Sequence, residues 1–269
     1  MSFIFGGFRI FISVVSLENW QKIWYNDHVL AERFRSKQAP ARIGEDMIKN
    51  RKIQLVYLSS ACTIGVLGVL ASVGLFEAVF RWDFYVYYTN ISNYLCVAVM
   101  FMELIQVLRS KEDGYIDACP KLKFIGLVGI LLTFLMFNVI MAPTKSLTYI
   151  LSARSLSLHV LIPILYVSDW FLFYERRKTT WRYPLIALTV PISYMAFILV
   201  HAAALKFNSS ILCFAGDAPL IYPYFFLNYD ELGFGGLILW AVIIVAALVA
   251  CGYLFCLLDK ICAKKKAPY

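Results

Sequence analysis

Six long apolar segments constrain this chain more than any other feature of its sequence. They lie at about residues 53–76, 84–108, 123–143, 153–175, 183–204 and 236–258. A helix needs about 20 apolar residues to cross ~30 Å of hydrocarbon, and an open sheet edge cannot face lipid because its amides would stay unpaired. The chain is 61% hydrophobic and 16% charged, whereas a soluble domain is about half apolar and about a quarter charged. We therefore predict an all-α, polytopic bundle of six transmembrane helices.

Basic residues are distributed unequally between the two sides that six spans create. Of the 25 Lys and Arg residues, 21 fall in the N-terminal segment, the 109–123 and 176–182 loops and the C-terminal tail. The other side holds only Arg81, Lys145, Arg154 and Lys206. Cytoplasmic loops carry such an excess, so we predict that both termini are cytoplasmic. The basic side meets anionic inner-leaflet lipid, and the net charge of +8 needs no nucleic-acid partner.

We predict an integral multi-pass membrane protein, which lies in the cell membrane if the organism is a prokaryote. The positions of the spans divide the chain into three regions. These are an N-terminal segment (1–52), the six-helix domain (53–260) and a basic tail (261–269). Within the first region, apolar residues from Trp20 to Phe34 recur at helical spacing beside basic ones, a pattern typical of a helix that lies in the membrane interface. Residues 1–50 serve either as an anchor alone or as a docking element for another membrane protein.

Cysteine and histidine usage argues against a metal site. The seven cysteines form no C-x-x-C pair, and the chain has only three histidines. Structural zinc sites and disulfide frameworks both need closely spaced ligand sets of these residues. We predict neither a metal nor a cofactor.

Polar residues occur at one depth in four of the predicted helices. With both termini inside, Thr89 and Asn138 lie about 8 Å below the outer boundary, His159 about 9 Å and His201 about 4 Å, at 1.5 Å rise per residue. Polar groups inside spans are costly and often mark function. Each of these residues also has a structural interpretation, as a hydrogen-bond partner between helices or to a carbonyl one turn earlier.

Two of these helices carry further polar residues close to the helix face that contains Thr89 or His159. Ser92 and Asn93 accompany Thr89, and Tyr166 accompanies His159, so we expect these residues to line the same pocket, which points into the bundle. Two acidic residues, Glu103 and Asp169, lie near the inner boundary. There we expect them to reach the interface or to meet the basic 176–182 loop.

Several short motifs resemble those of a known family. They are Tyr88-Thr-Asn-Ile-Ser-Asn93, His159-x-x-x-Pro163 with Asp169-Trp170, Pro191-x-x-Tyr194, Tyr222-Pro-Tyr-Phe and Gly233-x-Gly-Gly236. Over about residues 53–260 the chain resembles the prokaryotic six-transmembrane-helix family. That family is distantly similar to the androgen-induced membrane hydrolases, which cleave esters of fatty acids with hydroxy fatty acids.

The resemblance implies an intramembrane lipid-ester hydrolase with Thr89 as nucleophile and His159 as the histidine. A threonine hydroxyl needs a base of this type to take its proton. Acyl transfer also needs donors for the oxyanion, and we expect Asn93, Asn138 or His201 to provide them. The alternatives are a non-catalytic protein that binds or transports a lipid or fatty-acyl ligand, and an accessory subunit of a membrane complex. The loop at 205–235, with its Tyr222–Phe226 cluster, either caps the site or belongs to an aromatic belt.

Overall fold

The computed structural model describes residues 48–111, 113–114, 119–176, 178–207 and 220–264. The predicted interfacial helix and most of the predicted first region lie outside these ranges. The described residues belong to one unit, Gly44–Tyr269. Within it, six helices are long and apolar enough to cross a membrane, and the described part contains no strand. The chain is thus an all-α, integral multi-pass membrane protein, as predicted.

The six spanning helices differ from the predicted spans by a few residues at most ends. Three of them are interrupted and are described by more than one element. In chain order they are α3 (Arg51–Ser72); α4 (Tyr88–Arg109); α5 (Pro120–Leu135) with η3 (Met136–Met141) and η4 (Ala142–Thr144); α7 (Ala153–Leu156) with η5 (Ser157–Leu161) and α8 (Ile162–Phe173); α9 (Tyr183–Ala187) with α10 (Thr189–Phe207); and α11 (Tyr229–Lys264). The short elements η1 (Leu75–Glu77), η2 (Trp82–Tyr85), α6 (Leu147–Ile150) and η7 (Phe225–Leu227) lie in the connections.

Proline and glycine explain two of the departures from regular helix. Pro191 has no N–H to donate to the carbonyl of Ala187, and the fifth span breaks just there, between α9 and α10. The last span starts earlier than predicted because one turn precedes a kink at Gly233, whose φ of 63° suits glycine. The same helix continues to Lys264 and so takes in the start of the predicted tail.

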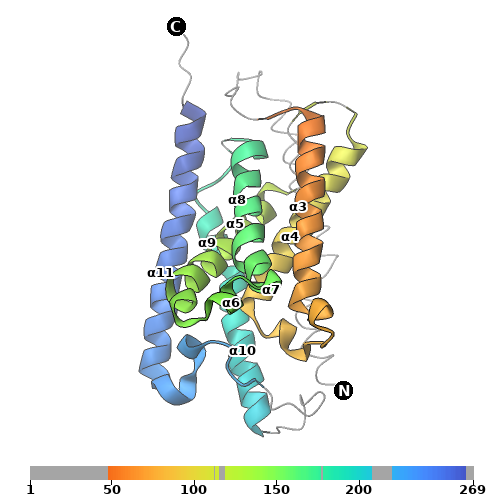
Figure 1. Cartoon of the computed structure of the whole chain (residues 1–269). Helices are drawn as coiled ribbons and strands as arrows, with labels where there is room; N and C mark the ends of the chain where they lie inside the picture. Colours follow the sequence, from red (N-terminus) through yellow and green to blue (C-terminus); the bar gives the residue numbers. More distant parts are fainter. Residues whose placement is uncertain (1–47, 112, 115–118, 177, 208–219, 265–269) are drawn as a thin grey trace. The chain divides into compact units, whose positions relative to one another are not determined.

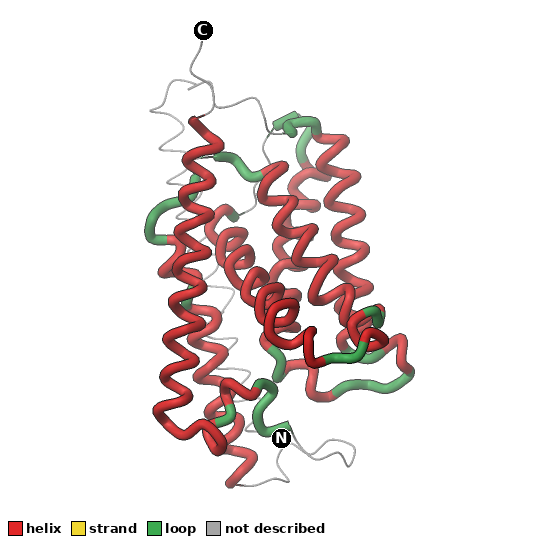
Figure 2. Tube along the Cα trace, turned by 60° about the vertical axis from the view of Figure 1, so that its left-hand side comes forward, coloured by secondary structure: helices red, strands yellow, loops and turns green. Residues whose placement is uncertain are grey.

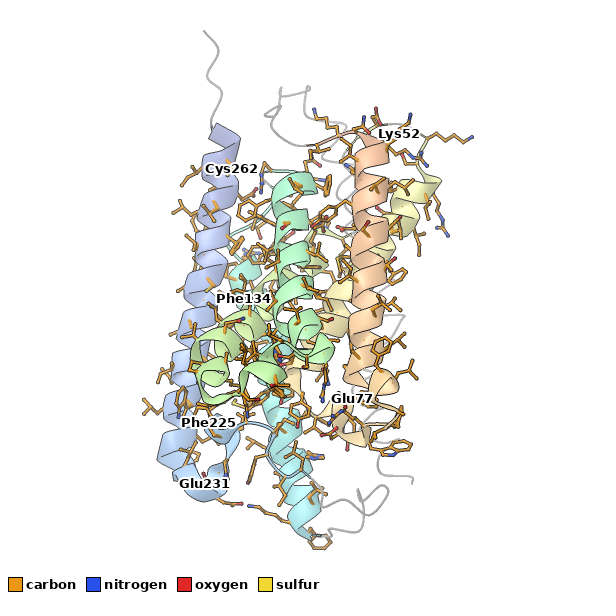
Figure 3. All side chains as sticks on the ribbon, viewed as in Figure 1. Lys52, Glu77, Phe134, Phe225, Glu231 and Cys262 are labelled. Atoms are coloured by element: carbon orange, nitrogen blue, oxygen red, sulfur yellow. The ribbon has the colours of Figure 1, made fainter. Side chains whose placement is uncertain are left out.

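The ends of the helices define two opposite ends of the bundle. α3 begins, and α11 ends, at the same end (Figure 1). Lys52 and Cys262 lie there, whereas Glu77, Phe225 and Glu231 lie at the opposite end (Figure 3). The helices run between these ends and the described connections join them there (Figure 2). We refer to the first as the inner end and to the second as the outer end, following the predicted orientation.

The third span is central to the packing. α5 contacts α4, α8, α9, α10 and α11. Its residues are buried almost all round, and a helix apolar on all faces is one that other helices surround. By contrast, α10 and α11 expose large apolar side chains, among them Val200, Leu239 and Val242. These two helices therefore present most of their surface to lipid, and each packs on α5, α9 and η7.

A cluster of charges is buried at the inner half of this core. The ammonium group of Lys123 lies 2.8 Å from a carboxylate oxygen of Glu103 and 2.8 Å from one of Asp169. The three side chains come from α5, α4 and α8, and each is at most 1% exposed. Glu103 and Asp169 were expected to reach the interface or the 176–182 loop, and that expectation is wrong. Charge neutralisation inside the bundle costs less than exposing carboxylates to hydrocarbon, provided that a cation lies within reach.

The orientation gives a first testable prediction. In a variant with Cys213 replaced by Ser, we expect Lys145→Cys to react with a membrane-impermeant maleimide in intact cells, because residue 145 is exposed at the predicted outer end. Lys178→Cys, in the loop at the opposite end, should react only after the cells are permeabilised. Each variant is compared with the Cys213→Ser parent, which measures labelling of the remaining cysteines. The reverse pattern would invert the predicted orientation.

Candidate functional site

An apolar cavity of about 70 Å³ lies in the outer half of the bundle, between α5–η3, α10 and α11. The first turn of α4 and the loop before α11 close one side of it. Its lining residues are Tyr88, Thr89, Leu132, Thr133, Met136, Phe137, Met141, Pro191, Ile192, Tyr194, Met195, Tyr224, Phe226, Leu227, Ala241, Ile244 and Val245. α10 and α11 each contact α5, and residues of all three helices line the cavity.

Thr89 brings a polar group to this cavity, and its partner is a tyrosine. The Thr89 hydroxyl lies 3.2 Å from the Tyr224 hydroxyl, and the Thr89 N–H donates to the same oxygen at 3.3 Å. Tyr224 thereby caps the first turn of α4, whose N-cap residue, Tyr87, supplies no side-chain hydrogen bond. Burial raises the pKa of Tyr224, so its hydroxyl is neutral at physiological pH and able to donate.

Tyrosines surround this pair of hydroxyls. The ring of Tyr194 lies 5.1 Å from that of Tyr88 and 6.4 Å from that of Tyr224, and the Tyr194 hydroxyl donates to the carbonyl of Val86 at 2.8 Å. Tyr224 also stacks on Phe226, with 5.0 Å between ring centres. Between the two predicted roles of the Tyr222–Phe226 cluster, these contacts favour a cap on the site.

His159 lies next to the cavity but does not line it. It is 9% exposed, so it does not face lipid. Its ring stacks on that of Phe137, with 3.6 Å between ring centres, and Phe137 is itself a cavity residue. The Nδ1 atom of His159 is buried and has no hydrogen-bond partner among the described residues. No hydrogen bond joins His159 to Thr89 in the described part of the chain.

Asn93 and Asn138 satisfy carbonyls that a proline leaves unpaired. Pro163 has no N–H, so it cannot donate to the carbonyl four residues back, that of His159, or to the one five residues back, that of Leu158. The helix widens to a π turn around these two carbonyls, in η5. The Asn93 side-chain amide donates to Leu158 at 3.0 Å, and that of Asn138 donates to His159 at 3.2 Å.

These bonds decide what the two amides are able to do. The second amide hydrogen of Asn93 goes to the Thr89 carbonyl at 2.7 Å, and that of Asn138 to the Phe134 carbonyl at 2.8 Å. An amide nitrogen has two hydrogens, so neither residue has one left for an oxyanion in this conformation. Their arrangement matches the structural interpretation, in which asparagines join helices.

The remaining predicted site residues do not line the cavity. Ser92 is buried and bonds to the Thr133 hydroxyl at 2.7 Å and to the Thr89 carbonyl at 3.0 Å. The Tyr166 hydroxyl donates to the carbonyl of Lys123 at 3.1 Å, at the inner half of the bundle. His201 bonds through Nε2 to the carbonyl of Leu220 at 3.2 Å. The structure thus joins the Thr89 hydroxyl to Tyr224 instead of to the side chain of another predicted site residue.

Within the described residues, no group of three His, Cys, Asp or Glu side chains is arranged to hold a metal ion. A comparison with family models, curated proteins and solved structures finds no match. The resemblance to the six-transmembrane-helix family and to the hydrolases therefore stays a prediction.

Proposed function

We propose that the protein binds the part of an acyl chain that lies next to its polar group, from a lipid or fatty acid, in this cavity, with that polar group at Thr89 and Tyr224. The observation that carries the proposal is the cavity itself, in which an apolar wall ends at a pair of hydroxyls. Small-molecule sites combine these two features, because apolar surface supplies affinity and a few polar groups fix orientation.

The hydrogen-bond count of the two hydroxyls supports a ligand acceptor. One of the two hydroxyl hydrogens lies between Thr89 and Tyr224, and either oxygen can be its donor. The other hydrogen is then available for an acceptor such as an ester or carboxyl oxygen. A lipid that enters from the outer leaflet would bring this oxygen to the same level as the hydroxyl pair, since the acyl chain extends toward the middle of the bilayer.

Blocking the cavity tests the proposal. We expect Ala241→Phe to weaken the binding of 1-dodecanol about tenfold, since excluding two methylene groups costs about 1.6 kcal/mol at ≈ 0.8 kcal/mol each. The dissociation constant is measured by titration of the purified protein in zwitterionic nanodiscs, read out by native mass spectrometry. Ala246→Phe is the matched control, because Ala246 lies on the same helix, is exposed and does not line the cavity. Equal binding by both variants and the wild type would exclude this cavity as the site.

A lipid-ester hydrolase is the second candidate, and the position of Phe137 favours it. This one side chain lines the cavity that contains Thr89 and also covers the ring of His159. Rotation of Phe137 would open the imidazole to the cavity. In the proposed reaction the Thr89 oxygen attacks the ester carbonyl, its proton passes to His159 and then to the leaving alcohol, and water releases the acid. The Tyr224 hydroxyl is the donor best placed for the oxyanion.

A further inference from the structure

The fifth and sixth spans meet near both of their ends. Toward the inner end, Pro184 of α9 packs closely on Gly252 of α11, where an added Cβ atom would lie only 2.8 Å from the Cβ of Pro184. Toward the outer end, the Lys206 ammonium group of α10 pairs with the Asp230 carboxylate of α11. Between these two points, α10 and α11 are not among the described helix pairs that are in extensive contact. The two spans are therefore joined above and below a stretch in which they lie apart.

The cavity lies level with this stretch. Its lining residues in the segments 191–195 of α10 and 241–245 of α11 fall between the two points at which the spans meet. Ile192, Met195 and Lys206 recur at helical spacing, so they share one face of α10. Lys206 pairs with a residue of α11, and the cavity-lining side chains of this face therefore point toward the same helix.

Side chains at this edge of the cavity also lie on the outside of the bundle. Ile192 is 47% exposed, and Met195, Ala241 and Val245 are half-buried. On the opposite wall, Phe137 is only 2% exposed. A layer one side chain thick thus separates the cavity from lipid between α10 and α11. We call the area bordered by Ile192, Met195, Ala241 and Val245 the lateral window.

We propose that the ligand enters the cavity from the bilayer through the lateral window, and that Ile192 is the side chain that opens and closes it. This inference rests on the proposed function and specifies the ligand as a lipid dissolved in the membrane. Moving Ile192 has no hydrophobic cost, since lipid tails are as apolar as the side chain. Opening the outer side would instead separate the stacked rings of Tyr224 and Phe226 and break the bond between Tyr224 and Thr89.

Rate constants measured at equilibrium test the window. The probe is 1-dodecanol with two fluorine atoms on the carbon next to its hydroxyl group, dissolved in the zwitterionic nanodiscs that hold the purified protein. Fluorine exchange NMR gives its bound fraction and its dissociation rate constant, and the association rate constant follows from both. We expect Ile192→Trp to lower the association rate constant about tenfold and Ile192→Ala to raise it about threefold, since a barrier on the path to a site limits association.

Val200→Trp and Val200→Ala are the matched controls. Val200 lies on the same helix, is 69% exposed and does not line the cavity, so both variants should keep the wild-type association rate constant. If Ile192→Ala changes only the dissociation rate constant, Ile192 is part of the wall and the window proposal is overturned, while the cavity proposal stands. Equal changes in the Ile192 and Val200 variants would overturn the window as well. A wild type that binds no probe would instead remove the proposed function on which the inference rests.

Discussion

Replacing Lys123 by Met is expected to lower the free energy of unfolding by about 3–5 kcal/mol, the range typical of removing one partner from a buried ion pair. Lys123 neutralises Glu103 and Asp169 within a core where all three side chains are at most 1% exposed. Methionine fills a similar volume but leaves two carboxylates facing each other without the ammonium group between them. The unfolding transition of the purified variant in detergent, followed by circular dichroism during titration with SDS, measures the change.

Two comparisons separate charge from packing in this experiment. Lys178→Met removes a lysine from the exposed pair with Glu175, and we expect a change of at most about 1 kcal/mol, as for surface pairs in general. Combining Lys123→Met with Glu103→Gln and Asp169→Asn removes the stranded charges, and this triple variant should be more stable than Lys123→Met alone. A triple variant no more stable than Lys123→Met would show that the cost arises from lost packing.

If the protein hydrolyses lipid esters, Thr89→Ala and His159→Ala are each expected to lower the rate about 10²–10⁴-fold, the range typical of losing a general base or the group that it activates. The double variant should be no slower than either single one, because residues that act as one unit are not additive. Thr89→Ser keeps a hydroxyl and should keep measurable activity. Release of fatty acid from a panel of fatty-acid esters, including esters of hydroxy fatty acids, gives the rates.

Matched controls for these variants come from outside the cavity. Thr63→Ala removes an exposed hydroxyl of α3 that bonds to the carbonyl of Ser59, and His201→Ala removes an imidazole that does not line the cavity. Both should hydrolyse esters at the wild-type rate. Wild-type activity in Thr89→Ala would eliminate Thr89 as nucleophile. A well-folded wild type that hydrolyses no ester would leave lipid binding as the function.

The membrane architecture could be predicted from the sequence because it depends on composition averaged over long segments. Each apolar block had to form a helix once lipid is the solvent, whatever its neighbours were. The interruptions were less predictable. Pro163 and Pro191 mark the positions where helices lose hydrogen bonds, but the sequence does not say which distant side chain replaces those bonds. At Pro163 the replacements come from Asn93 and Asn138, on two other helices.

The candidate site was predicted in part, for a physical reason. Depth along each helix follows from residue count, and it predicted that Thr89 and His159 lie at one level of the bundle. Which side chains touch depends on helix rotation and on loops, and no residue count gives those. His201 was predicted to lie in the same outer part of the bundle, yet it bonds to Leu220 in the connection before α11. Tyr224 was visible in the sequence only as one member of an aromatic cluster.

The position of Lys123 is one that the sequence predicted wrongly. Its position next to a basic loop placed it among the cytoplasmic charges, although the structure buries it completely. α5 begins at Pro120, three residues before the predicted start of the third span at residue 123. Lys123 therefore lies within the helix, in the core beside the two carboxylates. Without it, 20 basic residues remain on the predicted cytoplasmic side against four on the other, so the orientation argument does not change.

The Tyr224 cap also has a consequence for the order of events during synthesis. The hydroxyl that caps the first turn of α4 belongs to a residue 135 positions further along the chain. At 5–20 residues per second a ribosome needs roughly 7–27 s to translate that interval. Throughout this time the first turn of α4 is already synthesised but lacks its eventual cap. The outer end of α4 is therefore completed only when the segment before the last span emerges, so a ribosome stalled before residue 224 leaves the proposed acyl-chain site without one of its two hydroxyls.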